Sequence, residues 1–218
     1  RDMNKCVLCK RCETMCSEVQ TVGVLGDVGR GFETVVGCTL DLPMHETACT
    51  FCGQCVAVCP TAALTEVTQV EDVWTALASD KTVVVQTAPA VRVALGELFG
   101  MPAGTDVTGK MVTALRHMGF DYVYDTNWAA DVTIMEEAAE MVQRLNDPDA
   151  RLPILTSCCP SWVKFIEHQF GDCLDIPSTA KSPHEMFGAL AKTYLAERIG
   201  VNPEDMVVVS VMPCVAKK

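Results

Sequence analysis

The sequence lacks an apolar run of the roughly 18 residues that a membrane-spanning helix needs. It is also poor in basic residues, with 17 Lys and Arg against 28 Asp and Glu and a net charge of −11. Because a nucleic-acid surface neutralises phosphates with basic side chains, this balance argues against a nucleic-acid partner. No secretory signal is visible. The chain begins at Arg1, however, so we expect the N-terminus to be missing and leave export open.

Cysteine is the residue in excess, with thirteen in 218 residues. Most of them form two runs of equal spacing, Cys6-x2-Cys9-x2-Cys12-x3-Cys16 and Cys49-x2-Cys52-x2-Cys55-x3-Cys59. This spacing is typical of bacterial two-cluster ferredoxins, in which the last cysteine of each run ligates the other cluster. Structural zinc would use separated pairs, and the spacing also argues against a secreted disulfide scaffold. We therefore predict two [4Fe-4S] clusters, one held by Cys6, Cys9, Cys12 and Cys59, the other by Cys49, Cys52, Cys55 and Cys16.

The cysteine runs and the alternation of predicted strands and helices together indicate two domains. Residues 1–68 predict an α+β two-cluster ferredoxin-like domain, with a hairpin within 19–41 and a closing strand at 65–67. Cys38 fits neither run and is expected to be a buried thiol. Residues 69–218 predict an α/β unit with strands at 81–86, 121–125, 152–155 and 207–211 and helices at 70–80, 91–99, 107–118, 129–145, 162–170 and 183–199. This alternation is typical of a parallel sheet.

Several loops follow these predicted strands. Cys158 and Cys159 come after residues 152–155, Cys214 comes after 207–211, and the loops 88–89 and 125–128 follow the other two strands. Because ligands of open parallel sheets bind beyond the carboxyl ends of the strands, we expect these loops to converge. We predict that Cys214 and one of the paired thiols bind a cluster, and that the other thiol is free for chemistry. Scattered core cysteines are the alternative.

Two stretches carry a family resemblance: Thr156-Ser157-Cys158-Cys159-Pro160-Ser161-Trp162 and Met212-Pro213-Cys214-Val215-Ala216-Lys217-Lys218. With the tandem ferredoxin region ahead of them, they resemble the first two signature loops of iron-only ([FeFe]) hydrogenases. The resemblance covers essentially the whole chain and points to the multi-cluster, NAD(P)-linked catalytic subunits. It implies that residues 69–218 are the first α/β lobe of the H-cluster domain. The third cysteine loop is absent, so the lobe is expected to be incomplete and the isolated 218-residue fragment inactive.

In this family the H-cluster joins a [4Fe-4S] cubane to a two-iron unit. The resemblance implies that Cys159 and Cys214 ligate the cubane and that Cys158 is the free thiol that exchanges protons with the two-iron unit. The implied proton route then runs through Glu137 and Ser178 to Glu140. Glu137 and Glu140 are three residues apart on a predicted helix and therefore share a face; ordinary solvated glutamates are the alternative.

The resemblance also implies a pocket around the two-iron unit. Lys217 would donate to one of its ligands, and the lining would come from Pro89, Ala90, Pro183, His184 and Met212. Ala90 stands where many members have serine, and His184 stands where glutamine is common. Neither difference removes an iron ligand.

The implied activity is reversible H2 oxidation and proton reduction, with electrons passing through the two ferredoxin clusters. The expected electron partners are a ferredoxin, or flavin and iron–sulfur subunits that reduce NAD(P). A cytoplasmic location is expected, with a periplasmic one left open. The alternatives are a non-catalytic hydrogenase-like iron–sulfur protein, a ferredoxin-type electron-transfer module and a sensory homologue.

Overall fold

The computed structural model describes residues 1–218, and the chain folds into two compact units. Unit 1 comprises Arg1–Val67, Cys159–Pro177 and Cys214–Lys218, and unit 2 comprises Thr68–Cys158 and Ser178–Pro213. Unit 1 therefore contains the predicted ferredoxin region except its last residue, Thr68, together with two short segments from much later in the sequence.

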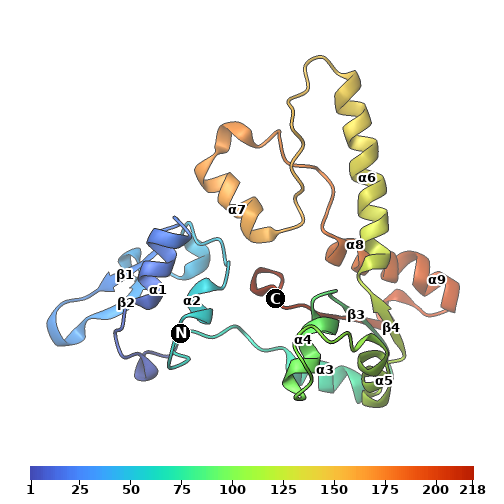
Figure 1. The fold of residues 1–218 in the computed structure, drawn as a ribbon, viewed down its shortest axis with the longest axis horizontal. Coiled ribbons are helices and arrows are strands. Elements are labelled where there is room, and N and C mark those ends of the chain that lie inside the picture. Colours follow the sequence, from blue (N-terminus) through green and yellow to red (C-terminus); the bar gives the residue numbers. More distant parts are fainter. The chain divides into compact units, whose positions relative to one another are not determined.

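The N-terminal part of unit 1 is built on a small hairpin between the two cysteine runs. Strands β1 (Leu25–Val28) and β2 (Val35–Cys38) pair antiparallel, as predicted, and the short helices α1 (Arg11–Thr14) and α2 (Gln54–Ala57) carry cysteines of the two runs (Figure 1). The core contains Val24, Leu25, Val36, Cys38 and Cys49. Cys38 is 1% exposed and is part of this core.

One predicted element of this region is wrong. Residues 65–67 form no strand, and their side chains are exposed. The hairpin forms a two-stranded sheet of its own, so this segment has no strand to pair with. The later segments of unit 1 contribute helix α7 (Pro160–Gln169) and a 3-10 turn at Val215–Lys217, and α7 packs against that turn.

Unit 2 is built on a three-stranded parallel sheet in the order β4-β3-β5, with β3 (Thr82–Thr87) between β4 (Tyr122–Asp125) and β5 (Met206–Val211). The run Val83-Val84-Val85 is completely buried, as expected for a central strand covered on both faces. Thr87 is in register with both Asp125 and Val211, so the three carboxyl ends lie at one edge.

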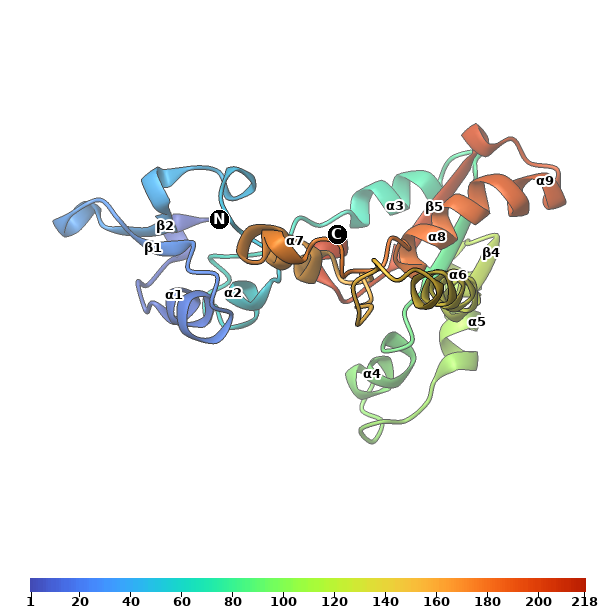
Figure 2. The ribbon, with the colours of Figure 1, turned by 90° about the horizontal axis from the view of Figure 1, so that it is seen from above.

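Helices cover both faces of this sheet. Val83 and Val85 pack with Phe120 and with residues of α3 (Val70–Leu77) and α5 (Thr108–Met118). Val84 packs on the opposite face with α6 (Asn127–Asn146), α8 (Pro183–Leu190) and α9 (Ala196–Ile199), where Phe187 is fully buried. Helix α4 (Val91–Leu98) completes the unit. Figure 1 shows α6 lengthwise and Figure 2 shows it end-on.

The helices predicted at 70–80, 91–99, 107–118, 129–145, 162–170 and 183–199 are all present, the last one with a π-helical stretch at Ala191–Leu195 between α8 and α9. It ends at Gly200, whose φ of 70° is the left-handed conformation that favours glycine. The predicted strand at 152–155 is wrong, since only Leu155 forms an isolated bridge and none of these residues is part of the sheet. Pro153 has no N–H to donate to a ladder. No helix is both long and apolar enough to cross a bilayer.

Candidate metal centres and proton relay

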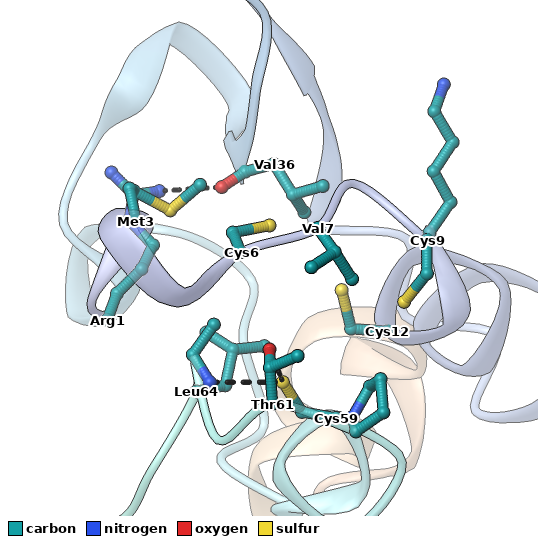
Figure 3. Close-up of a pocket in the computed structure, with 13 residues that line it drawn as sticks. Arg1, Met3, Cys6, Val7, Cys9, Cys12, Val36, Cys59, Thr61 and Leu64 are labelled. Atoms are coloured by element: carbon teal, nitrogen blue, oxygen red, sulfur yellow. Dashed lines mark hydrogen bonds between the residues drawn. The ribbon is translucent and has the colours of Figure 1, made fainter.

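The first predicted cluster site is a pocket that all four of its cysteines line. Cys6, Cys9, Cys12 and Cys59 surround it, and apolar side chains such as Val7, Val36 and Leu64 complete the wall (Figure 3). Burial raises the pKa of Cys12, and the neighbouring thiols of Cys59 and Cys6 raise it further. The last cysteine of the second run is therefore next to the first run, which is the crossover that the spacing predicted.

Cys59 has a different environment from its partners. Backbone N–H groups of Leu64 and Thr61 lower its pKa to about 7, and the Ala63 N–H donates to its sulfur at 3.2 Å. Several N–H donors aimed at one sulfur stabilise a thiolate, which is the form that binds iron. The sharp turn after Pro60 brings these donors to the sulfur.

The second predicted site contains Cys49, Cys52 and Cys55 together with Cys16. Burial raises the pKa of Cys55 to about 11, with further contributions from Cys52, Cys49 and Cys16. Burial also raises the pKa of Cys49, while the Phe51 N–H donates to its sulfur at 3.4 Å. Crowded, buried thiols of this kind fit an iron cluster, because the positive charge of iron offsets both desolvation and mutual repulsion. The eight cysteines of these two sites are thiols, with no disulfide among them.

The two predicted cubane ligands, Cys159 and Cys214, also belong to unit 1. Each stands immediately before a helical segment: Cys159 precedes Pro160 of α7, and Cys214 precedes the turn Val215–Lys217. The end of the chain is fixed within the unit by an ion pair between Lys218 and Glu66 at 2.6 Å. Lys217, the predicted donor to the two-iron unit, is half-buried in the same turn.

The predicted proton-relay residues belong to unit 2. Ser178 is buried and donates its hydroxyl to Glu140 at 2.7 Å. Glu137 is half-buried one turn earlier on α6. Cys158 ends the first segment of this unit, and the preceding residue, Ser157, donates to the carbonyl of Ala180 at 2.6 Å. The loop before Cys158 is therefore bonded to the segment that carries Ser178.

Glu140 is held by donors that the sequence alone did not reveal. Arg144 donates to one carboxylate oxygen at 2.6 Å, and the Thr179 N–H donates to the other at 3.1 Å. Burial raises the pKa of Glu140, but the bonds from Ser178, Arg144 and Thr179 outweigh it, so the pKa lies below its usual value. The signal in the sequence was an arginine four residues after a glutamate on a helix.

The predicted pocket-lining residues of unit 2 gather at the carboxyl edge of the sheet. Pro89 and Ala90 follow β3, Met212 follows β5, and Pro183 and His184 begin α8. Met212 is buried, and the Ala88 N–H donates to the carbonyl of Val211 at 3.1 Å. These residues come together because three strand ends and one helix start meet here.

Gln86 organises this edge and was not predicted. It is 1% exposed and donates to the carbonyl of His184 at 3.0 Å and to the Ser210 hydroxyl at 2.9 Å. Its own carbonyl accepts from the Thr126 hydroxyl at 3.0 Å. One side chain thus connects all three strand ends to the start of α8. The available signal was a lone polar residue at the end of an apolar strand.

Comparison with known proteins agrees with these sites. Residues 81–218 match the family described as iron only hydrogenase large subunit, C-terminal domain, and residues 5–63 match the 4Fe-4S dicluster domain. The chain therefore belongs to the iron-only hydrogenase large-subunit family. It has a ferredoxin-like domain and an α/β hydrogenase domain, and its cofactors are iron–sulfur clusters.

Individual relatives make the similarity more specific. Over its whole length the chain is 61% identical to the NADP-reducing hydrogenase subunit HndD of Solidesulfovibrio fructosivorans and 43% identical to iron hydrogenase 1 of Clostridium pasteurianum. It spans 38% of the length of each. The structure of apo [FeFe]-hydrogenase HydA1 from Chlamydomonas reinhardtii superposes with a TM-score of 0.65 and 42% identity, covering 69% of this chain and 39% of that one.

Proposed function

We propose that this chain is the electron-relay and H-cluster portion of an [FeFe]-hydrogenase catalytic subunit that interconverts H2 with protons and electrons. The observation that carries the proposal is the hydrogen bond from Ser178 to Glu140 at 2.7 Å, in a chain that also has a free thiol at Cys158. A ferredoxin module needs no such relay, because it moves electrons only. Proton transfer needs exchangeable groups within hydrogen-bond reach of one another.

In this proposal the crossed sets of cysteines hold the two ferredoxin-like clusters, and Cys159 and Cys214 are ligands of the H-cluster cubane. When bound, the H-cluster supplies the splitting and formation of the H–H bond. The Cys158 thiol gives and accepts the proton at the reaction site. Glu137 and Ser178 pass it to Glu140, where the lowered pKa favours release of the proton over its retention.

The remaining residues shape the pocket. Pro89, Ala90, Pro183, His184 and Met212 would line the pocket, and the hydrogen bonds of Gln86 to His184 and Ser210 hold this edge of the sheet in place. Lys217 would direct its ammonium group to an anionic ligand of the two-iron unit, for which a compact cation is well suited.

The proposed electron partners are subunits that reduce NADP, in the cytoplasm. The support is the 61% identity to a subunit of an NADP-reducing hydrogenase. We further propose residues 1–68 and 69–218 as the two domains. The first segment of unit 1 ends at Val67, close to this boundary.

The test is Cys158→Ala in the full-length, metal-loaded protein. We expect H2 turnover to be abolished in both directions while iron content stays at the wild-type value. Cys173→Ala, which removes a half-buried thiol outside every proposed site, is the matched control and should keep both. Loss of iron in the Cys158 variant would mean that this thiol is a ligand, and unchanged turnover would contradict the relay.

A further inference from the structure

Gly53 lies unusually close to the loop that carries Cys214. A Cβ atom added to Gly53 would lie 2.6 Å from Cγ2 of Val215 and 2.7 Å from its Cβ. Both residues belong to unit 1. Gly53 directly follows Cys52, a proposed ligand of the second cluster, and Val215 directly follows Cys214. The contact therefore joins the loops of two proposed iron sites, with the Val215 side chain packed against the Gly53 backbone.

The backbone conformation does not by itself explain the glycine. Gly53 has a φ of 75°, a region that glycine adopts without strain. The equivalent position of the first cysteine run is Lys10, between Cys9 and Cys12, and it has a φ of 59°. The loop therefore accepts a side chain in this conformation at the first site. The second site differs in having Val215 against it.

Other contacts hold the same two segments in place. The Lys218–Glu66 ion pair fixes the chain after Val215. On α7, which follows Cys159, the Lys164 ammonium lies 5.7 Å from the ring centre of Phe51, in the loop of the second site. The segments that follow both proposed cubane ligands are thus in contact with the second cysteine run, through Lys164 on Phe51 and Val215 on Gly53.

We propose that Gly53 is a positioning residue: its missing side chain lets the Cys214 loop lie directly on the loop of the second cluster, and this close approach sets the rate at which electrons pass between the second cluster and the catalytic cubane. This inference rests on the proposed function. One electron leaves the second cluster and one arrives at the cubane, and no bond is made or broken. Because electron tunnelling slows steeply with distance, a methyl group at Gly53 that pushes the loops apart slows the transfer.

The experiment is Gly53→Ala in the full-length holoenzyme. Flash reduction followed by spectroscopy of the second cluster measures how fast that cluster passes its electron on. We expect a severalfold slower transfer at unchanged iron content. The double variant Gly53→Ala with Val215→Gly, which removes both the Cγ2 and the Cβ atoms that the new methyl group would meet, should recover the wild-type rate. Val215→Phe enlarges the same contact without altering the Gly53 backbone and should also slow the transfer.

Two controls separate contact from backbone strain. Gly23 has a φ of 69° in the same unit with no atom within 4 Å of an added Cβ, so Gly23→Ala should transfer electrons at the wild-type rate. Lys10→Ala alters the equivalent position of the first site and should do the same. A wild-type transfer rate in both Gly53→Ala and Val215→Phe would overturn the inference, and so would a double variant that does not recover. Either result leaves the proposed function standing as long as the wild-type holoenzyme turns over H2. A wild-type holoenzyme without H2 turnover would instead refute the proposed function.

Discussion

The carboxylate of Glu140 gives a stability prediction with a definite pH dependence. Its side chain is 14% exposed and that of Arg144 is 13% exposed, so the ion pair is largely shielded from water. Glu140→Gln keeps the shape but replaces charged hydrogen bonds to Ser178, Arg144 and Thr179 with neutral ones. Since hydrogen bonds to a charged group contribute about 1.5–3 kcal/mol, we expect a loss of about 2 kcal/mol at neutral pH.

The sign of the pH dependence follows from the direction of the pKa shift. The folded-state pKa of Glu140 is lowered, so the contribution is fully present above the ordinary glutamate pKa of about 4.3 and is lost as the pH falls through the folded-state value. The difference between wild type and Glu140→Gln should therefore be constant near neutrality and shrink on acidification below the ordinary value.

Thermal unfolding followed by circular dichroism at several pH values measures this difference. A loss of about 2 kcal/mol corresponds to a melting temperature lower by roughly 4–8 °C in a chain of this size. Glu136→Gln, on an exposed side chain of the same helix, is the matched control and should change little. A pH-independent difference, or equal effects of the two substitutions, would refute the account of the Glu140 site.

Two further predictions concern the clusters and the sheet edge. Cys16→Ala should remove the second ferredoxin-like cluster and keep the first, because Cys16 lies near Cys49 and Cys55. Iron analysis with electron paramagnetic resonance measures which cluster is lost. Loss of the first cluster would contradict the crossover of the cysteine ligands. Gln86→Leu leaves the buried Thr126 hydroxyl and its other partners without their bonds, which should destabilise the protein by about 2–4 kcal/mol. Denaturant unfolding measures that loss, and a change below about 0.5 kcal/mol, typical of ordinary surface sites, would show that the network does not hold the edge.

Much of the fold could be predicted because local patterns match local structure. The periodicity of Ala129 to Leu145 predicted α6, and the apolar run Val83-Val84-Val85 predicted a strand buried on both faces. The segment 65–67 was predicted as the closing strand of the ferredoxin pattern and 152–155 as an apolar strand, but neither is part of a sheet. A strand requires a neighbouring strand to hydrogen-bond with as well as a suitable residue pattern, and the neighbouring strand can be far away in the sequence.

The proposed site was predictable to a different extent for each kind of residue. The cysteine spacing gave the crossed ligand sets, since the x2 spacing lets one loop reach several corners of a cluster. The roles of Arg144 and Gln86 were not predictable, because each depends on groups distant in sequence, such as Ser178 and His184. The close approach of Gly53 to Val215 was not predictable either, because the two residues are far apart in the sequence.

The sequence by itself determined the local chemistry of this protein: which thiols share a loop, which strands are buried and which residues share a helix face. Only the tertiary structure decided that Cys159 and Cys214 belong to the same compact unit as the ferredoxin-like region, while Cys158 belongs to the unit of Ser178 and Glu140. The physical reason is that covalent neighbours fix spacing along the chain. Packing between segments that are distant in the sequence decides which of these local groups come to lie next to one another.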